Sequence, residues 1–191
     1  TLDAMGSTPA IINKIVSRKG DYVVAIKDNQ RSVKRLGMAL LESNAEKIHS
    51  ITTDEKGHGR QEKRQYELIV FDEANKSGMG KGIEEHVEKF AKSKSFGRVT
   101  CTRTVKGETS TETRYYLSSL MDVKEFSKAV REHWAIENNL HWQLDVTFKE
   151  DAMRARIGQS GENLAVVRRL ALNMLKQEKT VKKSINRKRN L

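Results

Sequence analysis

The chain has 191 residues, enough for one good-sized domain or for a domain that carries an inserted module. Its 36 lysines and arginines outnumber its 25 aspartates and glutamates and give a net charge of +11, which points to a polyanionic partner: DNA, RNA or an anionic membrane. No stretch approaches the roughly 18 apolar residues of a membrane span, no signal peptide opens the sequence, and the single cysteine excludes an internal disulfide framework, so we expect a cytoplasmic protein.

The first 47 residues show a pattern of alternating strands and helices. Residues 1–5 are mostly apolar, as at the end of a strand, and Thr8 followed by Pro9 predicts the start of a helix. The continuous apolar run at residues 22–26 predicts a strand buried on both faces. Together these segments predict a βαβ unit with a parallel pair of strands, followed by a second helix at residues 32–42.

Residues 48–118 have a different, β-rich character. Four segments are predicted as strands: residues 48–53, 62–71, 98–105 and 111–117. Turn signals separate them at Lys56-Gly57-His58-Gly59 and Lys106-Gly107-Glu108, and a Gly-rich stretch at residues 77–82 precedes a short amphipathic helix with Ile83, Val87 and Phe90. We interpret residues 48–118 as a mainly antiparallel module inserted into an α/β domain. Within it, Cys101 is expected to be a small core residue, and His58 a turn residue that could also contact DNA.

The remaining residues are predicted to be helical and basic. Asp122, with Glu125 three residues later, resembles a capping box, and the helix that follows carries Phe126, Val130, Trp134, Leu140 and Leu144. A last helix begins near Ser160 and carries Leu164, Val167, Ala171, Met174 and Leu175. Residues 176–191 form a tail with seven lysines and arginines, which we expect to be mobile without a partner and which either contacts DNA or only solubilises the chain.

Glu137 stands out on the long helix before any family is considered. On a wheel of about 100° per residue it falls near the middle of the stripe formed by Phe126, Val130, Leu140 and Leu144, together with His133 and His141. A carboxylate on a buried face is costly unless it is paired, protonated or bound to a metal. Glu137 is therefore either a buried carboxylate satisfied by His133, His141 or an arginine, or part of a functional site.

Asp3 is the acidic residue that could share such a site. It lies at the carboxyl end of the first predicted strand, the edge at which open α/β sheets bind ligands, although it could equally be a helix cap or a turn residue. A strand-end aspartate and a glutamate on a packed helix could bind Mg²⁺, which prefers hard oxygen ligands. Two such ions would activate a water or a DNA 3′-hydroxyl for in-line phosphoryl transfer. The basic chain makes DNA phosphodiesters the natural substrate.

Two further interpretations of this helix stay open. The spacing of His133, Glu137 and His141 could hold zinc, although the sequence has neither the H-E-x-x-H pattern nor an evident cysteine partner. Trp134 and Trp142 could stack on flipped or single-stranded bases, or they could pack in the core.

Several stretches, in order along the chain, match one known pattern. They are Leu2-Asp3-Ala4-Met5-Gly6, residues 20–30, residues 56–62, the specific run Trp134-Ala135-Ile136-Glu137-Asn138-Asn139-Leu140-His141-Trp142 within residues 131–151, and residues 163–175. On these residues the chain resembles the H-repeat-associated insertion-sequence transposases, a family of the DDE superfamily.

The resemblance implies a ribonuclease-H-like α/β core with a β-rich insertion and C-terminal helices. Residues 1–47 would be the first part of the core, 48–118 the insertion, 119–175 the core helices with the glutamate, and 176–191 the basic tail. Asp3 would match the second catalytic aspartate and Glu137 the catalytic glutamate, with Mg²⁺ or Mn²⁺ as the metal. DNA-binding or supporting roles would fall to Arg60, Arg131, His133, Asn138, Lys149, Arg154 and Arg156. The implied activity is metal-dependent cleavage and transfer of DNA strands by a homo-oligomer acting on transposon ends and target DNA.

Two departures from the family pattern matter. The family's first aspartate lies upstream in an Asp-Gly-Lys motif that has no counterpart in this sequence, so we expect the chain by itself to be an inactive piece of something longer, with an incomplete metal site. The lysine that many related transposases place seven residues after the glutamate is Leu144 here, and Lys149 or the pair Arg154 and Arg156 could contact the phosphate backbone instead. Three hypotheses result: a DNA transposase domain, a non-catalytic nucleic-acid-binding remnant of a transposase, and a structural zinc protein.

Overall fold

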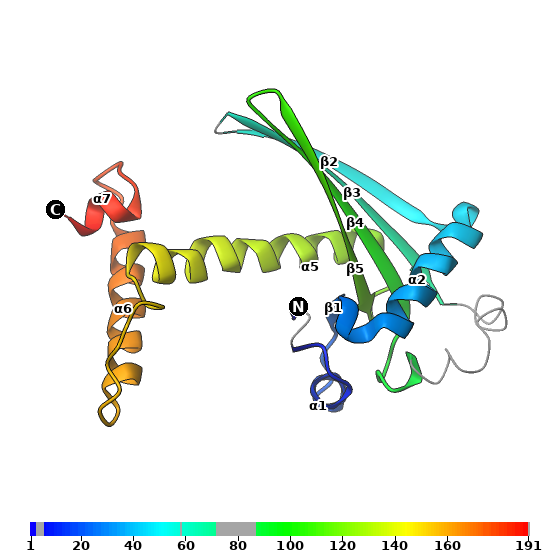
Figure 1. Cartoon of the computed structure of the whole chain (residues 1–191), viewed down its shortest axis with the longest axis horizontal. Coiled ribbons are helices and arrows are strands. Elements are labelled where there is room, and N and C mark those ends of the chain that lie inside the picture. Colours follow the sequence, from blue (N-terminus) through cyan, green and yellow to red (C-terminus); the bar gives the residue numbers. More distant parts are fainter. Residues whose placement is uncertain (3–5, 58, 72–86, 191) are drawn as a thin grey trace. The chain divides into compact units, whose positions relative to one another are not determined.

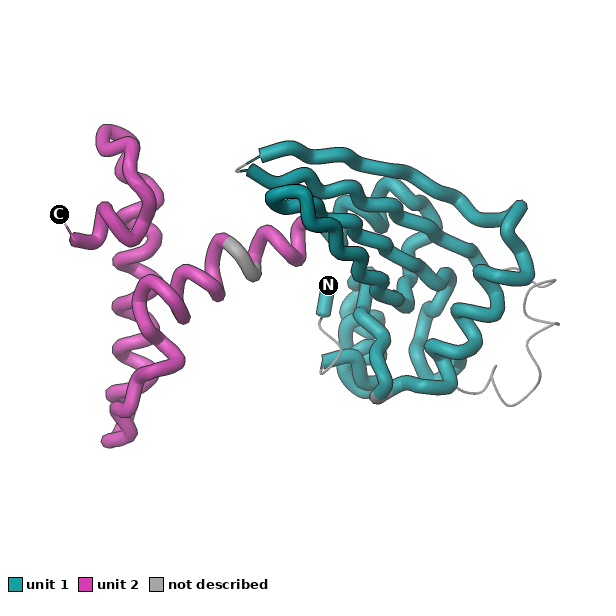
Figure 2. Tube along the Cα trace, turned by 45° about the horizontal axis from the view of Figure 1, so that its top comes forward, with its two compact units in different colours: residues 1–131 teal, residues 132–191 magenta. Residues whose placement is uncertain are grey.

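The computed structural model describes residues 1–2, 6–57, 59–71 and 87–190, without the side chains of Asn29, Glu137 and Asn138. The chain divides into two compact units, residues 1–131 and residues 132–191 (Figure 2). None of the described helices is long and apolar enough to cross a membrane.

The first unit is built on one antiparallel sheet of five strands in the order β1-β5-β4-β3-β2 (Figure 1). The strands are β1 (Val23–Ile26), β2 (His49–Gly57), β3 (Arg60–Val70), β4 (Ser95–Val105) and β5 (Glu108–Ser118). The five strands predicted between residues 22 and 118 are therefore confirmed. The β4–β5 hairpin turns at Lys106 and Gly107, whose φ angles of 51° and 88° are the left-handed pair that a two-residue hairpin loop requires.

The predicted inserted module is continuous with the strand that precedes it. β1 pairs with β5, with Val23 opposite Ser118, so a single sheet contains both. Leu2 forms a parallel bridge to Val24, in which the Leu2 amide donates to the Val23 carbonyl (3.1 Å) and the Ala25 amide donates to the Leu2 carbonyl (3.2 Å). This bridge confirms the parallel pair of the predicted βαβ unit. Residues 3–5, which include Asp3, lie outside the described residues.

Two helices pack on one face of the sheet, as the apolar spacing predicts. They are α1 (Pro9–Ser17), which Thr8 caps by accepting the Ile11 amide, and α2 (Arg31–Ser43), flanked by short 3-10 helices at Asp28–Gln30 and Ala45–Lys47. α2 lies so close to β4 that a Cβ added to Gly37 would fall 2.1 Å from the Phe96 ring. The core on this face contains Ile12, Val24, Ile26, Val33, Leu36, Ile69, Phe96 and Leu117, together with Val87 and Phe90 from the predicted short helix, most of which lies outside the described residues.

The opposite face is covered by α5 (Val123–Ile136). Its start is the predicted cap, because Asp122 Oδ1 accepts the amides of Lys124 (2.7 Å) and Glu125 (3.0 Å). Phe126 of α5 is fully buried against Gly97 and meets Tyr116 edge to face, with ring centroids 5.7 Å apart. Because side chains alternate along a strand, Gly97 lies on the opposite face from Phe96. The sheet is therefore sandwiched between α2 and α5.

The second unit is helical. After Ile136 the chain continues as two π-helical segments, Glu137–His141 and Gln143–Thr147, and then forms α6 (Ser160–Gln177) and α7 (Ile185–Arg189). The apolar stripe predicted for the last long helix is largely exposed, including Val167 and Met174, and Leu172 is buried instead.

Part of the basic C-terminal segment is helical, and its predicted mobility without a partner stays a prediction. Ser184 caps α7 by accepting the Arg187 amide, Lys188 donates to the carbonyls of Leu175 and Glu178, and Arg189 donates to the carbonyl of Thr147. These backbone carbonyls hold the segment against α6 and the second π-helical segment.

Candidate functional site

Glu137 begins a π-helical segment directly after α5 ends at Ile136. Such segments are rare, and they occur frequently at functional sites because they change the direction of side chains relative to a regular α-helix. The side chain of Glu137 and all of Asp3 lie outside what the structure describes, so their predicted pairing stays a prediction. Among the described residues, no three His, Cys, Asp or Glu side chains are placed to hold a metal ion.

The single apolar stripe predicted around Glu137 is wrong. A wheel at about 100° per residue applies only to a regular α-helix, and the π-helical segments begin at Glu137. Phe126 and Val130 are buried in the first unit, whereas Leu144 is buried in the second unit and Leu140 is only partly buried. Burial along this stretch therefore divides between two separate packing surfaces.

The side chains on either side of Glu137 differ in their exposure to solvent. His133 and Trp134 are half-buried, and His141 is exposed. Trp142 is 52% exposed, so the core interpretation is wrong for this residue, and base stacking stays a prediction. Burial raises the pKa of the Asp145 carboxyl, and the charge and hydrogen bond of Asp151 add to the rise.

The predicted DNA-contacting residues after the π-helices are exposed. Lys149 has a φ of 53°, in the left-handed region that ends a helix. Arg156 donates to the carbonyls of Met153 and Ala155, both at 3.1 Å, and Arg154 is exposed beside it. These side chains could reach a phosphate, and no described contact tests that role.

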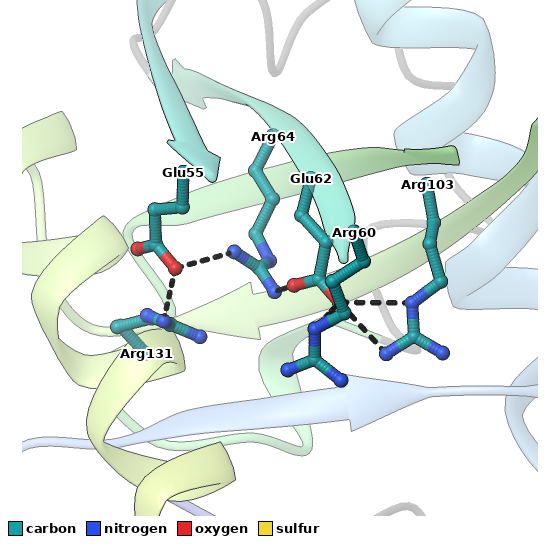
Figure 3. A network of polar contacts seen from close by, with 6 residues as sticks. All are labelled: Glu55, Arg60, Glu62, Arg64, Arg103 and Arg131. Carbon is teal, nitrogen blue, oxygen red and sulfur yellow. Dashed lines mark hydrogen bonds and ion pairs between the residues drawn. The ribbon is translucent and has the colours of Figure 1, made fainter. Parts of the chain in front are cut away.

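Two other predicted DNA-contacting residues, Arg60 and Arg131, belong to a charged network at the outer half of the sheet (Figure 3). Arg60 Nε lies 3.3 Å from Glu62 Oε1, and Arg131 pairs with Glu55. Arg64 bridges the two carboxylates, because it pairs with Glu62 and lies 3.4 Å from Glu55. The sixth member is Arg103, whose Nε donates to Glu62 Oε1 at 2.8 Å.

The strand register explains why these six side chains meet. Arg60, Glu62 and Arg64 alternate along β3 and therefore share one face. Glu55 of β2 and Arg103 of β4 are the register partners of Glu62. Arg131 reaches the same face from α5.

Glu62 is the centre of the network and was not singled out from the sequence. It is only 3% exposed in a stretch, residues 60–65, where no other residue is buried. The signal that could have found it is the run of charges at every second position, Arg60, Glu62 and Arg64, on a predicted strand. Cys101, expected in the core, is instead partly exposed on β4.

The Glu62 ion pairs should stabilise the fold in a pH-dependent way. Burial acts to raise the pKa of the carboxyl, but the hydrogen bond from Arg103 and the charges of Arg64 and Arg60 outweigh it, and the pKa lies below its ordinary value of 4.5. Because the pKa of Glu62 is lower in the folded than in the unfolded protein, its ionised carboxylate stabilises the fold at pH values above the unfolded-state pKa. This stabilisation is lost as the pH falls through the folded-state pKa.

We therefore expect the melting temperature of Glu62→Gln to lie below that of the wild type near neutral pH, and the gap to narrow below about pH 4. Thermal unfolding followed by circular dichroism at several pH values measures this. The exposed Glu112→Gln is the control and should show a small, nearly constant difference. A gap for Glu62→Gln that stays constant down to about pH 3 would contradict the assignment.

Residues 2–174 match the family model described as the transposase DDE domain. YncI of Escherichia coli O157:H7 is 36% identical over 99% of this chain and 48% of its own length. YbfL and YhhI of Escherichia coli strain K12 are each 34% identical over 98% of this chain and 50% of theirs.

YncI and YhhI are named as candidate transposases, YhhI with the qualifier H repeat-associated. The chain spans about half the length of these curated relatives. No solved structure matches the chain.

Proposed function

Because the chain belongs to the transposase DDE domain family, we propose that it is the part of a DNA transposase that carries the catalytic glutamate, Glu137. The reaction would be metal-dependent cleavage and transfer of DNA strands. The observation that carries this proposal is where Glu137 lies. The residue that matches the family's glutamate is the first residue of the π-helical segment after α5, and such segments are frequent at functional sites.

We propose further that the first unit contains part of a ribonuclease-H-like core. Leu2 bridges β1 in parallel, and Asp3 follows Leu2 directly in the chain. An acidic residue at the end of a strand next to β1 suits the second catalytic aspartate of the family. Residues 48–118 would be the β-rich insertion, although their strands extend the same sheet.

The proposed cofactor is Mg²⁺ or Mn²⁺, held by Asp3 and Glu137. The chemistry of this donor set fits, because both ions prefer carboxylate oxygens. When bound, such ions activate a water or 3′-hydroxyl and stabilise the leaving oxygen of the phosphodiester. The family's first aspartate has no counterpart in the 191 residues, so we propose that another segment of a longer protein completes the site.

The proposed partner is DNA, both the transposon ends and the target, bound by a homo-oligomer in the bacterial cytoplasm. The net charge of +11 supports a polyanionic partner, since lysines and arginines that neutralise phosphates supply most non-specific affinity. The alternative is a remnant that binds nucleic acid without cleaving it, which the same charge would also support.

The test uses the complete protein and a supercoiled plasmid that carries the element encoding it. The wild type should cleave the plasmid with Mg²⁺ and stop when the metal is chelated. Asp3→Asn should bind Mn²⁺ about tenfold or more weakly in calorimetry and lose cleavage. The matched control is Asp28→Asn, an exposed aspartate that pairs with Lys34 at 3.0 Å, and it should behave as the wild type. Absence of cleavage by the wild type, with DNA binding retained, would favour the remnant instead.

A further inference from the structure

We propose that the arginine row across the outer half of the sheet, formed by Arg60, Arg64, Arg103 and Arg131, binds the DNA sugar-phosphate backbone, and that Glu62 is the positioning residue that holds it. This inference rests on the proposed function, because it takes DNA as the partner. It goes further by assigning a surface of the first unit to backbone contact that does not involve Asp3 or Glu137.

The row lies on the face of the sheet where α5 packs, at the end of the strands where most residues are exposed. β4 is buried near Ser95 and exposed toward Val105, and residues 108–113 of β5 are all exposed. Figure 1 shows these hairpin ends projecting beyond α5, the helix on this face. A sheet end with little apolar burial contributes little to a core, so its charged side chains are available for another partner.

The network carries more positive charge than it neutralises. Four arginines against two glutamates, Glu55 and Glu62, leave two positive charges (4 − 2 = 2). Exposed ion pairs add little stability, and a purely structural network needs no such excess. The surplus charge is what a phosphate oxyanion would satisfy.

Three of the four guanidinium groups remain accessible while they are held in place; the side chain of Arg64, between the two glutamates, is only 15% exposed. The side chains of Arg60, Arg103 and Arg131 are 48%, 49% and 45% exposed, whereas that of Glu62 is 4% exposed. Figure 3 shows the four arginines in a row, with Arg131 at one end and Arg103 at the other. A guanidinium has five N–H donors in a planar fork, so donors remain beyond those that contact Glu62 or Glu55. Arginine held this way loses less entropy on binding phosphate than a free lysine does.

The opposite face of the same strands is chemically different. It carries a ladder of threonine pairs, Thr100 with Thr113, Thr102 with Thr111 and Thr104 with Thr109, at 3.4, 3.4 and 3.0 Å. Lys63 and Lys56 are exposed on that face, since Lys63 lies between Glu62 and Arg64 on β3 and Lys56 is the register partner of Gln61. The sheet therefore offers matched controls a few ångströms from the proposed surface.

The first experiment compares two double variants of the 191-residue chain that each lose two positive charges. DNA binding is measured by fluorescence anisotropy with a labelled duplex over a range of salt concentrations. Arg60→Gln with Arg103→Gln should weaken binding by on the order of tenfold and reduce the slope of log affinity against log salt by about two. Lys56→Gln with Lys63→Gln should weaken it less than about threefold. Equal losses in the two variants would overturn the proposal.

The second experiment tests the positioning role of Glu62 by asking whether Glu62→Gln raises or lowers the affinity for DNA. Glu62→Gln raises the net charge by one, so simple electrostatics predicts tighter DNA binding. If Glu62 holds the arginines in place, binding instead weakens by about threefold or more. Glu112→Gln, on the same face and with the same charge change, should bind as tightly as the wild type or more tightly. Tighter binding by Glu62→Gln would overturn the positioning role.

Thermal unfolding shows which variants are folded. Should Glu62→Gln fail to fold, the two double variants still decide the binding surface, because the arginines they change are about half exposed, the lysines are exposed, and Arg64 remains as a partner of Glu62. Failure of this inference is distinct from failure of the proposed function. If Arg60→Gln with Arg103→Gln leaves DNA affinity unchanged, only the arginine row is contradicted. If the wild-type chain does not bind DNA at all, the proposed function is contradicted as well.

Discussion

Replacing Glu137 with alanine in the complete protein is expected to reduce Mg²⁺-dependent strand cleavage by about a thousandfold or more. A carboxylate that holds a catalytic metal supports several kcal/mol of transition-state stabilisation, and each 1.36 kcal/mol corresponds to a factor of about ten in rate. DNA affinity should stay the same or rise slightly, because the substitution removes a negative charge. Plasmid cleavage and anisotropy on the same preparations measure both effects.

The matched control is Glu132→Ala, an exposed glutamate of α5 five positions earlier. It removes the same charge from the same helix and should leave cleavage within about twofold of the wild type. Cleavage retained by Glu137→Ala would contradict the catalytic assignment. Equal loss in both variants would show that the helix, and not the carboxylate, is what cleavage requires.

The second large effect is expected from Gly97→Ala. A Cβ at this position would lie 2.4 Å from Cζ of Phe126, so the buried ring would have to leave its site between β4 and α5. Overpacking of this kind typically lowers the free energy of unfolding by about 1–3 kcal/mol. We expect about 3 kcal/mol here, because Phe126 is fully buried and β4 is paired with a strand on each side. Chemical denaturation measures the change.

Two companion variants make this prediction specific. Gly57→Ala is the control, because a Cβ there meets nothing within 4 Å, and it should leave stability nearly unchanged. Combining Gly97→Ala with Phe126→Leu should recover part of the loss, since the smaller side chain gives up the clashing atoms. A double variant less stable than Gly97→Ala alone would contradict the steric explanation.

The strands of the first unit were predictable because local patterns determine them. Alternation and turn residues such as Lys106 and Gly107 fix each hairpin without reference to the rest of the chain. The joining of β1 to β5 was not predictable, since it depends on which edge remains unpaired after the hairpins form. The module interpreted as inserted therefore shares its sheet with the strand before it.

The helix around Glu137 shows the limit of periodicity. Sequence identified the right segment, but the wheel assumed a regular helix past Ile136, where the chain becomes π-helical. A pattern of apolar residues does not report such a change, because the same residues can be buried in two separate places. Glu137 was singled out first by the wheel and then by its family signature, and the environment of its side chain stays a prediction.

Only some residues of the charged network were singled out from the sequence. Arg60 and Arg131 came from the resemblance, whereas Glu62, Arg64 and Arg103 did not. Their roles depend on strand register, which places Glu62 opposite both Glu55 and Arg103. Register is set by pairing across hairpins, so a buried carboxylate in the exposed half of a strand cannot be recognised from composition alone.

The pairing of β1 with β5 has a consequence for the order of folding. Tyr22 and Ser118, which are 96 positions apart, are joined by a buried hydrogen bond at the end of this pair. Closing so long a loop costs more entropy than closing a hairpin, and contacts distant in sequence slow folding. The β2–β3 and β4–β5 hairpins can form while β1 is still unpaired. During synthesis, β1 therefore cannot pair with β5 until β5 has left the ribosome. The core between the sheet and the first two helices is completed only after that pairing.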